Sequence, residues 1–185
     1  MKTVLVPLAQ GCEELEAITI IDLLRRAGIT VITAGLDEKP VKASRGVMLI
    51  PDTTLDNAVK QSLDMIVLPG GLPGADHLNN DPRIHQLLKE MAQQGKSIAA
   101  ICAAPKVLAN AGLLANKSAT SYPGVLENME VPDMHFKDVP VLKDGNIITS
   151  RGPGTAMDFA LELIDTLVGR EIRTQVEASL VRAGT

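Results

Sequence analysis

Cys102 is the residue whose neighbours in the sequence most favour a role as a nucleophile. It follows a short apolar run, Ser97–Ile101, that suits a buried strand, and it precedes Pro105, which suits the first turn of a helix because its missing N–H is no loss there. A helix start stabilises negative charge, so we expect the pKa of this thiol to lie below its reference value of about 8.5. Small residues on both sides favour a sharp turn of the nucleophile-elbow kind. The alternative is a buried cysteine that acts only as a small apolar side chain.

Glu16 is the second candidate, because it is a carboxylate on the apolar side of its own helix. The pattern of apolar residues predicts a helix over Glu14–Ala27, and Glu16 falls inside its apolar arc. Either this end of the helix is exposed and Glu16 is solvated, or Glu16 is partly buried near Cys102 with a raised pKa. The helix pattern alone does not choose between the two. Glu13 and Glu14 are expected to be solvated residues of the first turn.

A glycine-rich segment, LPGGLPGAD, follows another apolar run and predicts a tight turn. Gly70 and Gly71 permit a close approach of backbone to a ligand and leave N–H groups free. Such groups, together with the N–H of Ala103, could stabilise an oxyanion formed at Cys102. The glycine patterns of dinucleotide-binding folds and of P-loops are absent from the sequence, which argues against both classes of site.

The histidines offer no clear partner for the thiol. His85 falls in the middle of a predicted helix, His135 in an irregular polar segment, and His77 just after the glycine-rich turn, so surface positions are expected for all of them. No spacing typical of metal ligands is present, so we predict no metal and no cofactor.

Composition limits the class of protein. The chain has 185 residues with 45% hydrophobic residues and a net charge of −4, which fits one domain with a sizeable core. No basic cluster stands out and aromatic residues make up 2%, so a nucleic-acid partner is not indicated. The start of the chain does not have the pattern of a signal peptide, and no apolar stretch reaches membrane-spanning length. We therefore expect a cytoplasmic protein without membrane contact.

Strands and helices are expected to alternate, which predicts an α/β fold with a mostly parallel sheet covered on both faces. The expected strands are Thr3–Leu8, Ile29–Ala34, Val47–Ile50, Leu63–Leu68 and Ser97–Ile101, with a hairpin over Pro140–Ser150 turning at Asp144-Gly145. Further helices are expected over Ile84–Gln94, Thr155–Val168 and Glu171–Leu180. Because ligands bind beyond the carboxyl ends of parallel strands, three segments should meet there: Ala9–Glu13, Pro69–Gly74 and Cys102.

Six blocks of sequence, in one order over nearly the whole chain, resemble the DJ-1/PfpI superfamily and within it the branch of DJ-1 and YajL. They are GCEELEA at Gly11–Ala17, LLRRAGI at Leu23–Ile29, SRGV at Ser44–Val47, VLPGG at Val67–Gly71, AAICAAP at Ala99–Pro105 and TSRGPGTA at Thr149–Ala156. The resemblance implies one domain over residues 1–185, a flavodoxin-like three-layer sandwich, and a homodimer.

The resemblance also implies roles for single residues. Cys102 is the reactive, easily oxidised cysteine, and Glu16 is the acid that hydrogen-bonds it. Gly71 and Ala103 supply the oxyanion N–H groups. The arginines near the dimer interface of this branch match two positions of the chain, Arg26 and Arg45.

The sequence departs from the pattern of the branch beside the expected site. Where DJ-1 proteins have Thr-His-Pro, this chain has Ser121-Tyr122-Pro123, so no Cys–His pair is expected there. The phenol of Tyr122 could hydrogen-bond a substrate but is a poor base near neutral pH. Ala103 also replaces the histidine that follows the cysteine in protease-like members, which argues against a peptidase.

Two functions are implied by the resemblance, and both use Cys102 and Glu16. The first is a cofactor-free glyoxalase or deglycase that acts on methylglyoxal or on early glycation adducts. The second is a redox sensor or chaperone-like stress protein, in which Cys102 is oxidised. Cys12 is either an incidental loop residue or a thiol that resolves oxidised Cys102.

Overall fold

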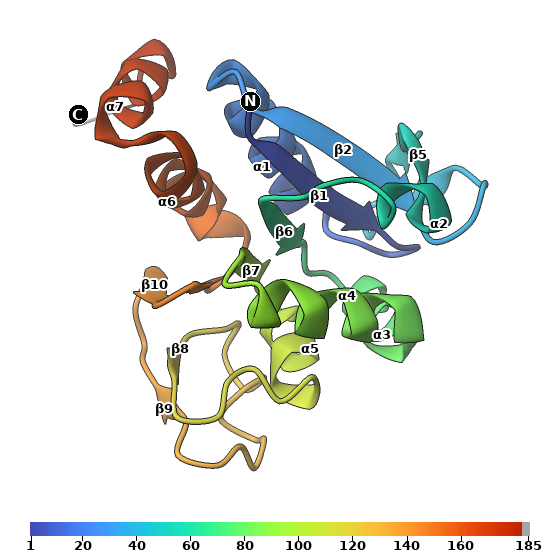
Figure 1. The fold of residues 1–185 in the computed structure, drawn as a ribbon, viewed down its shortest axis with the longest axis vertical. Helices are drawn as coiled ribbons and strands as arrows, with labels where there is room; N and C mark the ends of the chain where they lie inside the picture. The colour runs from blue at the N-terminus through green and yellow to red at the C-terminus, as the bar shows by residue number, and fades with distance from the viewer. Residues whose placement is uncertain (183–185) are drawn as a thin grey trace.

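A seven-stranded sheet forms the centre of the computed structural model, which describes residues 1–182 (Figure 1). In chain order its strands are β1 (Thr3–Leu8), β2 (Thr30–Gly35), β5 (Thr53–Thr54), β6 (Met65–Leu68), β7 (Ser97–Ile101), β10 (Val141–Asp144) and β11 (Ile147–Ser150). They lie side by side in the order β10-β11-β7-β6-β1-β2-β5. Among these strands only β10 and β11 pair antiparallel, as the expected hairpin, and the other neighbours are parallel. The mostly parallel sheet is therefore confirmed.

Helices cover both faces of the sheet, which completes the expected three-layer sandwich (Figure 1). One face carries α1 (Glu14–Arg26), α6 (Ala156–Val168) and α7 (Arg170–Ser179). The other carries α2 (Leu55–Ala58), α3 (Gly74–Asn80), α4 (Pro82–Gln93) and α5 (Pro105–Asn110). The helices expected at α1, α4, α6 and α7 are present with small shifts of their ends.

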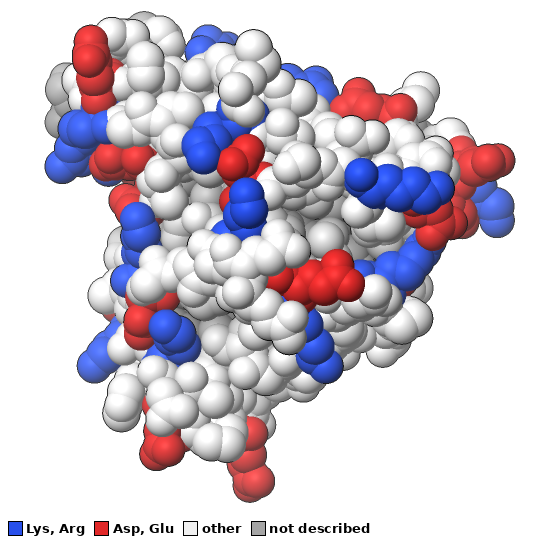
Figure 2. All heavy atoms as spheres, viewed as in Figure 1, with Lys and Arg blue, Asp and Glu red and all other residues white. Residues whose placement is uncertain are grey.

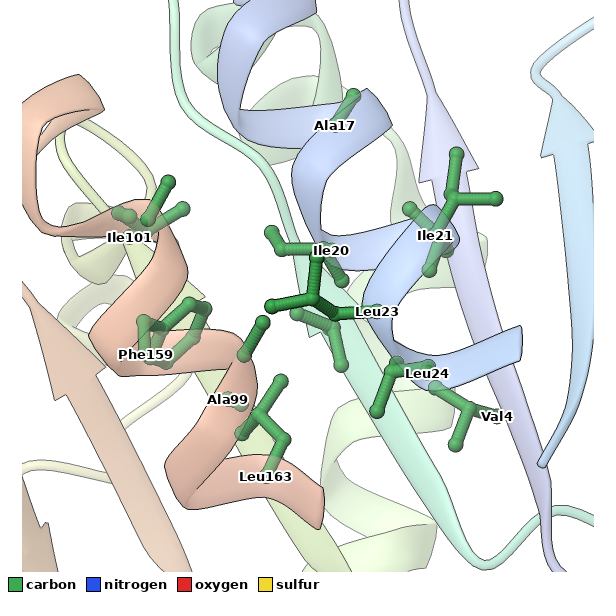
Figure 3. Close-up of a cluster of buried hydrophobic side chains, with 14 of the residues drawn as sticks. Val4, Ala17, Ile20, Ile21, Leu23, Leu24, Ala99, Ile101, Phe159 and Leu163 are labelled. Atoms are coloured by element: carbon green, nitrogen blue, oxygen red, sulfur yellow. The ribbon is translucent and has the colours of Figure 1, made fainter. Parts of the chain in front are cut away.

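The two layers are built by alternation of side chains along fully buried strands. In β1, Val4 and Val6 pack with α1 and α6, whereas Leu5 between them packs with the helices of the other face. Figure 3 shows the first of these clusters, where Ile20 of α1 lies near Phe159 of α6 above the sheet. Because both faces are buried, the central strands β1, β6 and β7 are apolar beyond their first residues and carry no polar alternation.

The predicted strand over Val47–Ile50 is present at its centre as β4 (Met48–Leu49), but it does not join the main sheet as expected. It pairs antiparallel with β3 (Val41–Lys42) in a separate hairpin. Val47, Met48 and Ile50 are exposed, so this segment lacks the burial on both faces that the central strands have. A second small sheet pairs β8 (Ser118–Ala119) with β9 (His135–Phe136), and a 3₁₀ turn, η1 (Pro153–Thr155), precedes α6.

The chain order of the sheet reverses next to β1. From β1 the chain moves to β2 and β5 on one side and then returns to β6 on the other side. In such sheets the point where the strand order reverses is where ligands bind, beyond the carboxyl ends of the strands. The loops after β1 and β6 meet there, since the N–H of Glu13 donates to the carbonyl of Gly70 at 2.9 Å.

The surface visible in Figure 2 carries Lys and Arg intermingled with Asp and Glu, without a large field of one sign. That face offers no electrostatic footprint for nucleic acid. Within residues 1–182, no helix is long and apolar enough to cross a membrane.

Replacing Phe159 by Ala should lower the free energy of unfolding by about 3 to 5 kcal/mol, because a fully buried ring would leave a cavity between α6 and the sheet. Urea unfolding measures this change. The control is Met157→Ala on the same helix, whose side chain is 45% exposed and whose loss should cost less than about 0.5 kcal/mol. Equal losses in the two variants would contradict this account of the core.

Candidate active site

Cys102 lies on a strained turn between β7 and α5. Its φ of 64° is in the left-handed region, which residues with a side chain seldom adopt, so the expected sharp turn is present. Both backbone groups of the cysteine are held by hydrogen bonds. Its N–H donates to the carbonyl of Ser150 at 3.0 Å, and its carbonyl accepts from the N–H of Tyr122 at 2.9 Å. These anchors from β11 and from the loop after β8 keep the strained residue in place.

Glu16 is fully buried on α1, which decides between the two interpretations of this residue. Its Oε2 accepts a hydrogen bond from the N–H of Gly70 at 2.8 Å. Its Oε1 is buried without a partner of standard hydrogen-bond geometry. Burial raises the pKa of Glu16 to about 7, against the lowering effects of the Gly70 N–H and of the neighbouring Cys102 thiol.

The Cys102 thiol is also shielded, with its residue 8% exposed. Burial and the charge of the Glu16 carboxylate raise the pKa of Cys102 to about 12, although the N–H groups of Gly71 and Ala103 lower it. The expectation of a lowered pKa was therefore wrong in direction. The expected N–H donors are present, but α5 is only six residues long, and desolvation with a carboxylate beside the thiol outweighs them.

Gly70 and Gly71 both lie too close to their neighbours for a side chain, and Gly71 also has a left-handed backbone. A Cβ on Gly70 would lie 2.6 Å from the Cβ of Cys102 and 2.8 Å from Oε2 of Glu16, so no side chain fits there. Gly71 has a φ of 87°, which glycine adopts without strain. Because the N–H of Gly70 is donated to Glu16, the N–H of Gly71 is the one of this pair that faces the thiol.

Glu13 and Glu14 are partly buried and hydrogen-bonded rather than fully solvated, which corrects the sequence-based expectation. The hydroxyl of Ser44 lies 2.8 Å from Glu13 and 2.9 Å from Glu14, and the N–H of Arg45 donates to Glu14 at 2.8 Å. Burial opposes these bonds, yet together with the backbone N–H of Glu14 itself they lower the pKa of Glu14. The two carboxylates therefore fasten the β3–β4 hairpin to the start of α1.

The remaining candidates lie around this centre or away from it. The ring of Tyr122 is half exposed and lies against Gly152, where an added Cβ would be 3.3 Å from the ring. The guanidinium of Arg26 pairs with Asp22 at 2.6 Å on the exposed side of α1. Arg45 is exposed in the turn between β3 and β4.

Cys12 is fully buried beneath the glycine-rich turn, and the structure records both cysteines as free thiols. Burial raises the pKa of Cys12 to about 12. His77 and His135 are exposed, while Nε2 of His85 lies 2.7 Å from the carbonyl of Asn79. Over residues 1–182, no cluster of three or more His, Cys, Asp or Glu is placed to hold a metal ion.

The arrangement suits nucleophilic addition to a carbonyl carbon. Glu16, with a pKa near neutrality, can take the proton of the thiol as the sulfur attacks. Two backbone N–H groups at the sulfur can then hold the charge that moves to the carbonyl oxygen. The carbonyl of Ser150 and the N–H of Tyr122 are functional groups that sequence reasoning missed, because backbone groups leave no signal in residue type.

Comparison with known proteins agrees with this fold. The model of the DJ-1/PfpI family matches residues 2–166. The zebrafish Parkinson disease protein 7 homolog is 45% identical over 184 residues, covering 97% of each chain. The crystal structure of Drosophila melanogaster DJ-1beta has a TM-score of 0.94 at 46% identity and covers 98% of each chain. A Caenorhabditis elegans relative named glutathione-independent glyoxalase DJR-1.2 is 38% identical over 162 residues, covering 88% of this chain and 86% of that protein.

Replacing Glu16 by Gln should stabilise the protein increasingly as the pH rises. The folded protein keeps the Glu16 proton up to about pH 7, whereas the unfolded chain releases it near 4.5, so this group costs stability as the pH rises between these values. At about 1.4 kcal/mol per pKa unit, the advantage of the Gln variant should reach about 3 kcal/mol above pH 7. Urea unfolding across this pH range measures it.

Glu14→Gln is the matched control, because the lowered pKa of Glu14 gives the opposite sign. That variant should lose stability relative to the unchanged protein as the pH rises through the range in which Glu14 ionises. A stability difference for Glu16→Gln that does not change with pH would contradict the raised pKa.

Proposed function

The chain belongs to the DJ-1/PfpI family, and on this premise we propose that it is a cysteine-dependent, cofactor-free glyoxalase or deglycase. Its substrates are methylglyoxal or early glycation adducts, and its setting is the carbonyl stress of the cytoplasm. One observation carries the proposal: the buried carboxyl of Glu16 lies beside the Cys102 thiol with a pKa raised to about 7. The glyoxalase name of the nematode relative supports it.

In the first step the sulfur of Cys102 adds to the aldehyde carbon of methylglyoxal. The thiol proton passes to the Glu16 carboxylate, and the new oxyanion lies between the N–H groups of Gly71 and Ala103. Return of the proton from Glu16 to this oxygen gives a hemithioacetal. A general base with a pKa near the working pH is effective for such transfers in both directions.

The second stage is an isomerisation followed by hydrolysis. Glu16 takes the hydrogen on the former aldehyde carbon as a proton and returns it to the neighbouring ketone carbon, while the hydroxyl proton moves to the ketone oxygen. The product is a thioester of lactate on Cys102. Water then cleaves the thioester, which releases lactate and restores the thiol, so that methylglyoxal and one water are consumed for each lactate.

Tyr122 has a part in substrate binding under this proposal. Its half-exposed ring beside Gly152 and its backbone bond to Cys102 support a position at the rim of the site. Its phenol would donate a hydrogen bond to the ketone oxygen of the substrate. Because a phenol is a weak base near neutral pH, proton transfer stays with Glu16.

The proposal includes a homodimer. Leu15 and Ile18 on α1 are 52% and 47% exposed, and Val47 and Met48 on the hairpin are 49% and 57% exposed. The N–H of Val47 reaches Glu14, so the hairpin and α1 present their exposed apolar side chains together. A second copy of the chain is the proposed cover of this surface, with Arg26 and Arg45 at its border.

One observation favours a second function: the buried Oε1 of Glu16 has no hydrogen-bond partner of standard geometry. If hydrogen peroxide oxidises the Cys102 thiol to a sulfinate, a protonated Glu16 would donate a hydrogen bond to one of its oxygens. The reaction consumes two peroxides and releases two waters for the two oxygens gained. The protein would then act as a redox sensor or chaperone-like stress protein that is controlled by the state of Cys102.

Purified protein should form lactate from methylglyoxal, and Cys102→Ala should lower turnover by roughly a thousandfold or to background, because the nucleophile is lost. Enzymatic assay of lactate measures this. Cys12→Ala is the matched control and should keep the rate of the unchanged protein. Absence of lactate with the unchanged protein would overturn the glyoxalase proposal, and a gain of two oxygens at Cys102 under mild peroxide would then support the redox function.

Sedimentation at micromolar concentration should show a dimer, and the double substitution Leu15→Asp with Ile18→Asp should produce a monomer. Two charges would be buried without partners in the proposed interface, which is strongly unfavourable. Val181→Asp, at a position 88% exposed, is the control and should leave the dimer intact. A monomer of the unchanged chain would exclude the homodimer.

A further inference from the structure

The two N–H groups that face the Cys102 sulfur come from different parts of the chain. Gly71 lies in the segment that leads into α3, and Ala103 lies in the turn that leads into α5. The two segments leave neighbouring strands, since β6 and β7 pair up to Leu68 and Ala100, and Gly71 and Ala103 each lie three residues beyond this last pair. Beyond the sheet, their spacing also depends on how α3 and α5 are held together.

Two polar contacts join these helices. Nζ of Lys106 on α5 forms an ion pair with Asp76 on α3. Nδ2 of Asn110 donates to Oδ1 of Asn79 at 3.0 Å. The partners are one turn apart on each helix, so the contacts follow one another along the facing sides of α3 and α5.

The rest of the contact between α3 and α5 is apolar and less directional. Leu78 of α3 and Val107 of α5 are both fully buried in the same cluster. Apolar burial favours contact but does not by itself fix how far one short helix slides along another. A charged hydrogen bond has a defined length and direction. Lys106 is suited to form such a directional contact between α3 and α5, because its side chain is only 20% exposed and its aliphatic part packs along the protein.

We propose that Lys106 and Asp76 are positioning residues of the site. Their ion pair holds α3 against α5 and thereby sets the spacing of the N–H groups of Gly71 and Ala103 around the Cys102 sulfur. The effect on turnover rests on the proposed glyoxalase function. The effect on the reactivity of the thiol does not, because the same two N–H groups stabilise a thiolate formed in any reaction.

If Lys106 and Asp76 acted on Cys102 only through their charges, the Asp76→Asn variant would change the reaction rate of the thiol in the opposite direction. If Asp76 acted only through its negative charge, Asp76→Asn would favour the thiolate and make the thiol react faster. If Asp76 acts by holding Lys106 in place, Asp76→Asn loosens the helix pair and makes the thiol react more slowly. The electrostatic and the positioning mechanism predict the same result only for Lys106→Met, in which the Cys102 thiol reacts more slowly.

The experiment measures the rate of alkylation of Cys102 by iodoacetamide across a pH series, in a Cys12→Ala background that leaves one thiol. Asp76→Asn and Lys106→Met should each slow alkylation by about tenfold, less than the roughly hundredfold loss that removal of a whole oxyanion donor causes. Combining them should slow it no further, because both remove the same contact. The exchanged pair, Asp76→Lys with Lys106→Asp, should recover most of the rate.

Lys117→Met is the control, since Lys117 forms a similarly shielded ion pair with Asp144 outside α3 and α5. It should leave alkylation unchanged. With methylglyoxal as substrate, the two positioning variants should lower kcat and leave KM nearly unchanged. Faster alkylation of Asp76→Asn, unchanged alkylation in both single variants, or strictly additive effects would overturn the proposal. Slowed alkylation without any lactate formation by the unchanged protein would uphold the positioning role and reject the glyoxalase function.

Discussion

The burial of the Glu16 carboxyl between Gly70 and Cys102 is the constraint on which the rest of the site depends. A carboxyl without solvent needs a hydrogen-bond donor, and the N–H of Gly70 supplies it at 2.8 Å. That approach leaves no room for a side chain at Gly70. The hydrogen bond to this buried carboxyl therefore helps to fix the glycine-rich turn, and with it the direction of the Gly71 N–H.

The strained backbone of Cys102 is the second element of the same arrangement. A left-handed residue with a side chain costs on the order of 1 to 3 kcal/mol and persists only when its surroundings hold it. Here the end of β11 and the loop after β8 hold both of its backbone groups. This left-handed residue places the sulfur just beyond the carboxyl end of β7, where the N–H groups of Gly71 and Ala103 reach it.

The ionisation of this pair bears on both proposed chemistries. Burial raises the pKa of both groups, and the Glu16 carboxylate raises the pKa of Cys102 further, whereas the hydrogen bond with the thiol lowers the pKa of Glu16. With the proton on sulfur, the carboxylate is a base for addition to an aldehyde. With the proton on oxygen, the carboxyl is a donor for an oxidised sulfur. The two proposed functions therefore differ in which partner keeps the proton.

The sequence by itself determined the features that depend on one element and its neighbours along the chain. Periodicity located the central strands and the long helices, Pro105 and small residues located the turn at Cys102, and Glu16 stood out on an apolar face. Tertiary structure alone decided what depends on partners far apart in the chain. The donor to Glu16 comes from 54 positions away, and β4 pairs with β3 in a separate hairpin instead of joining the main sheet. The raised pKa of Cys102 also depends on the tertiary structure. Desolvation and the charge of Glu16 act through space, so no local sequence pattern predicts them.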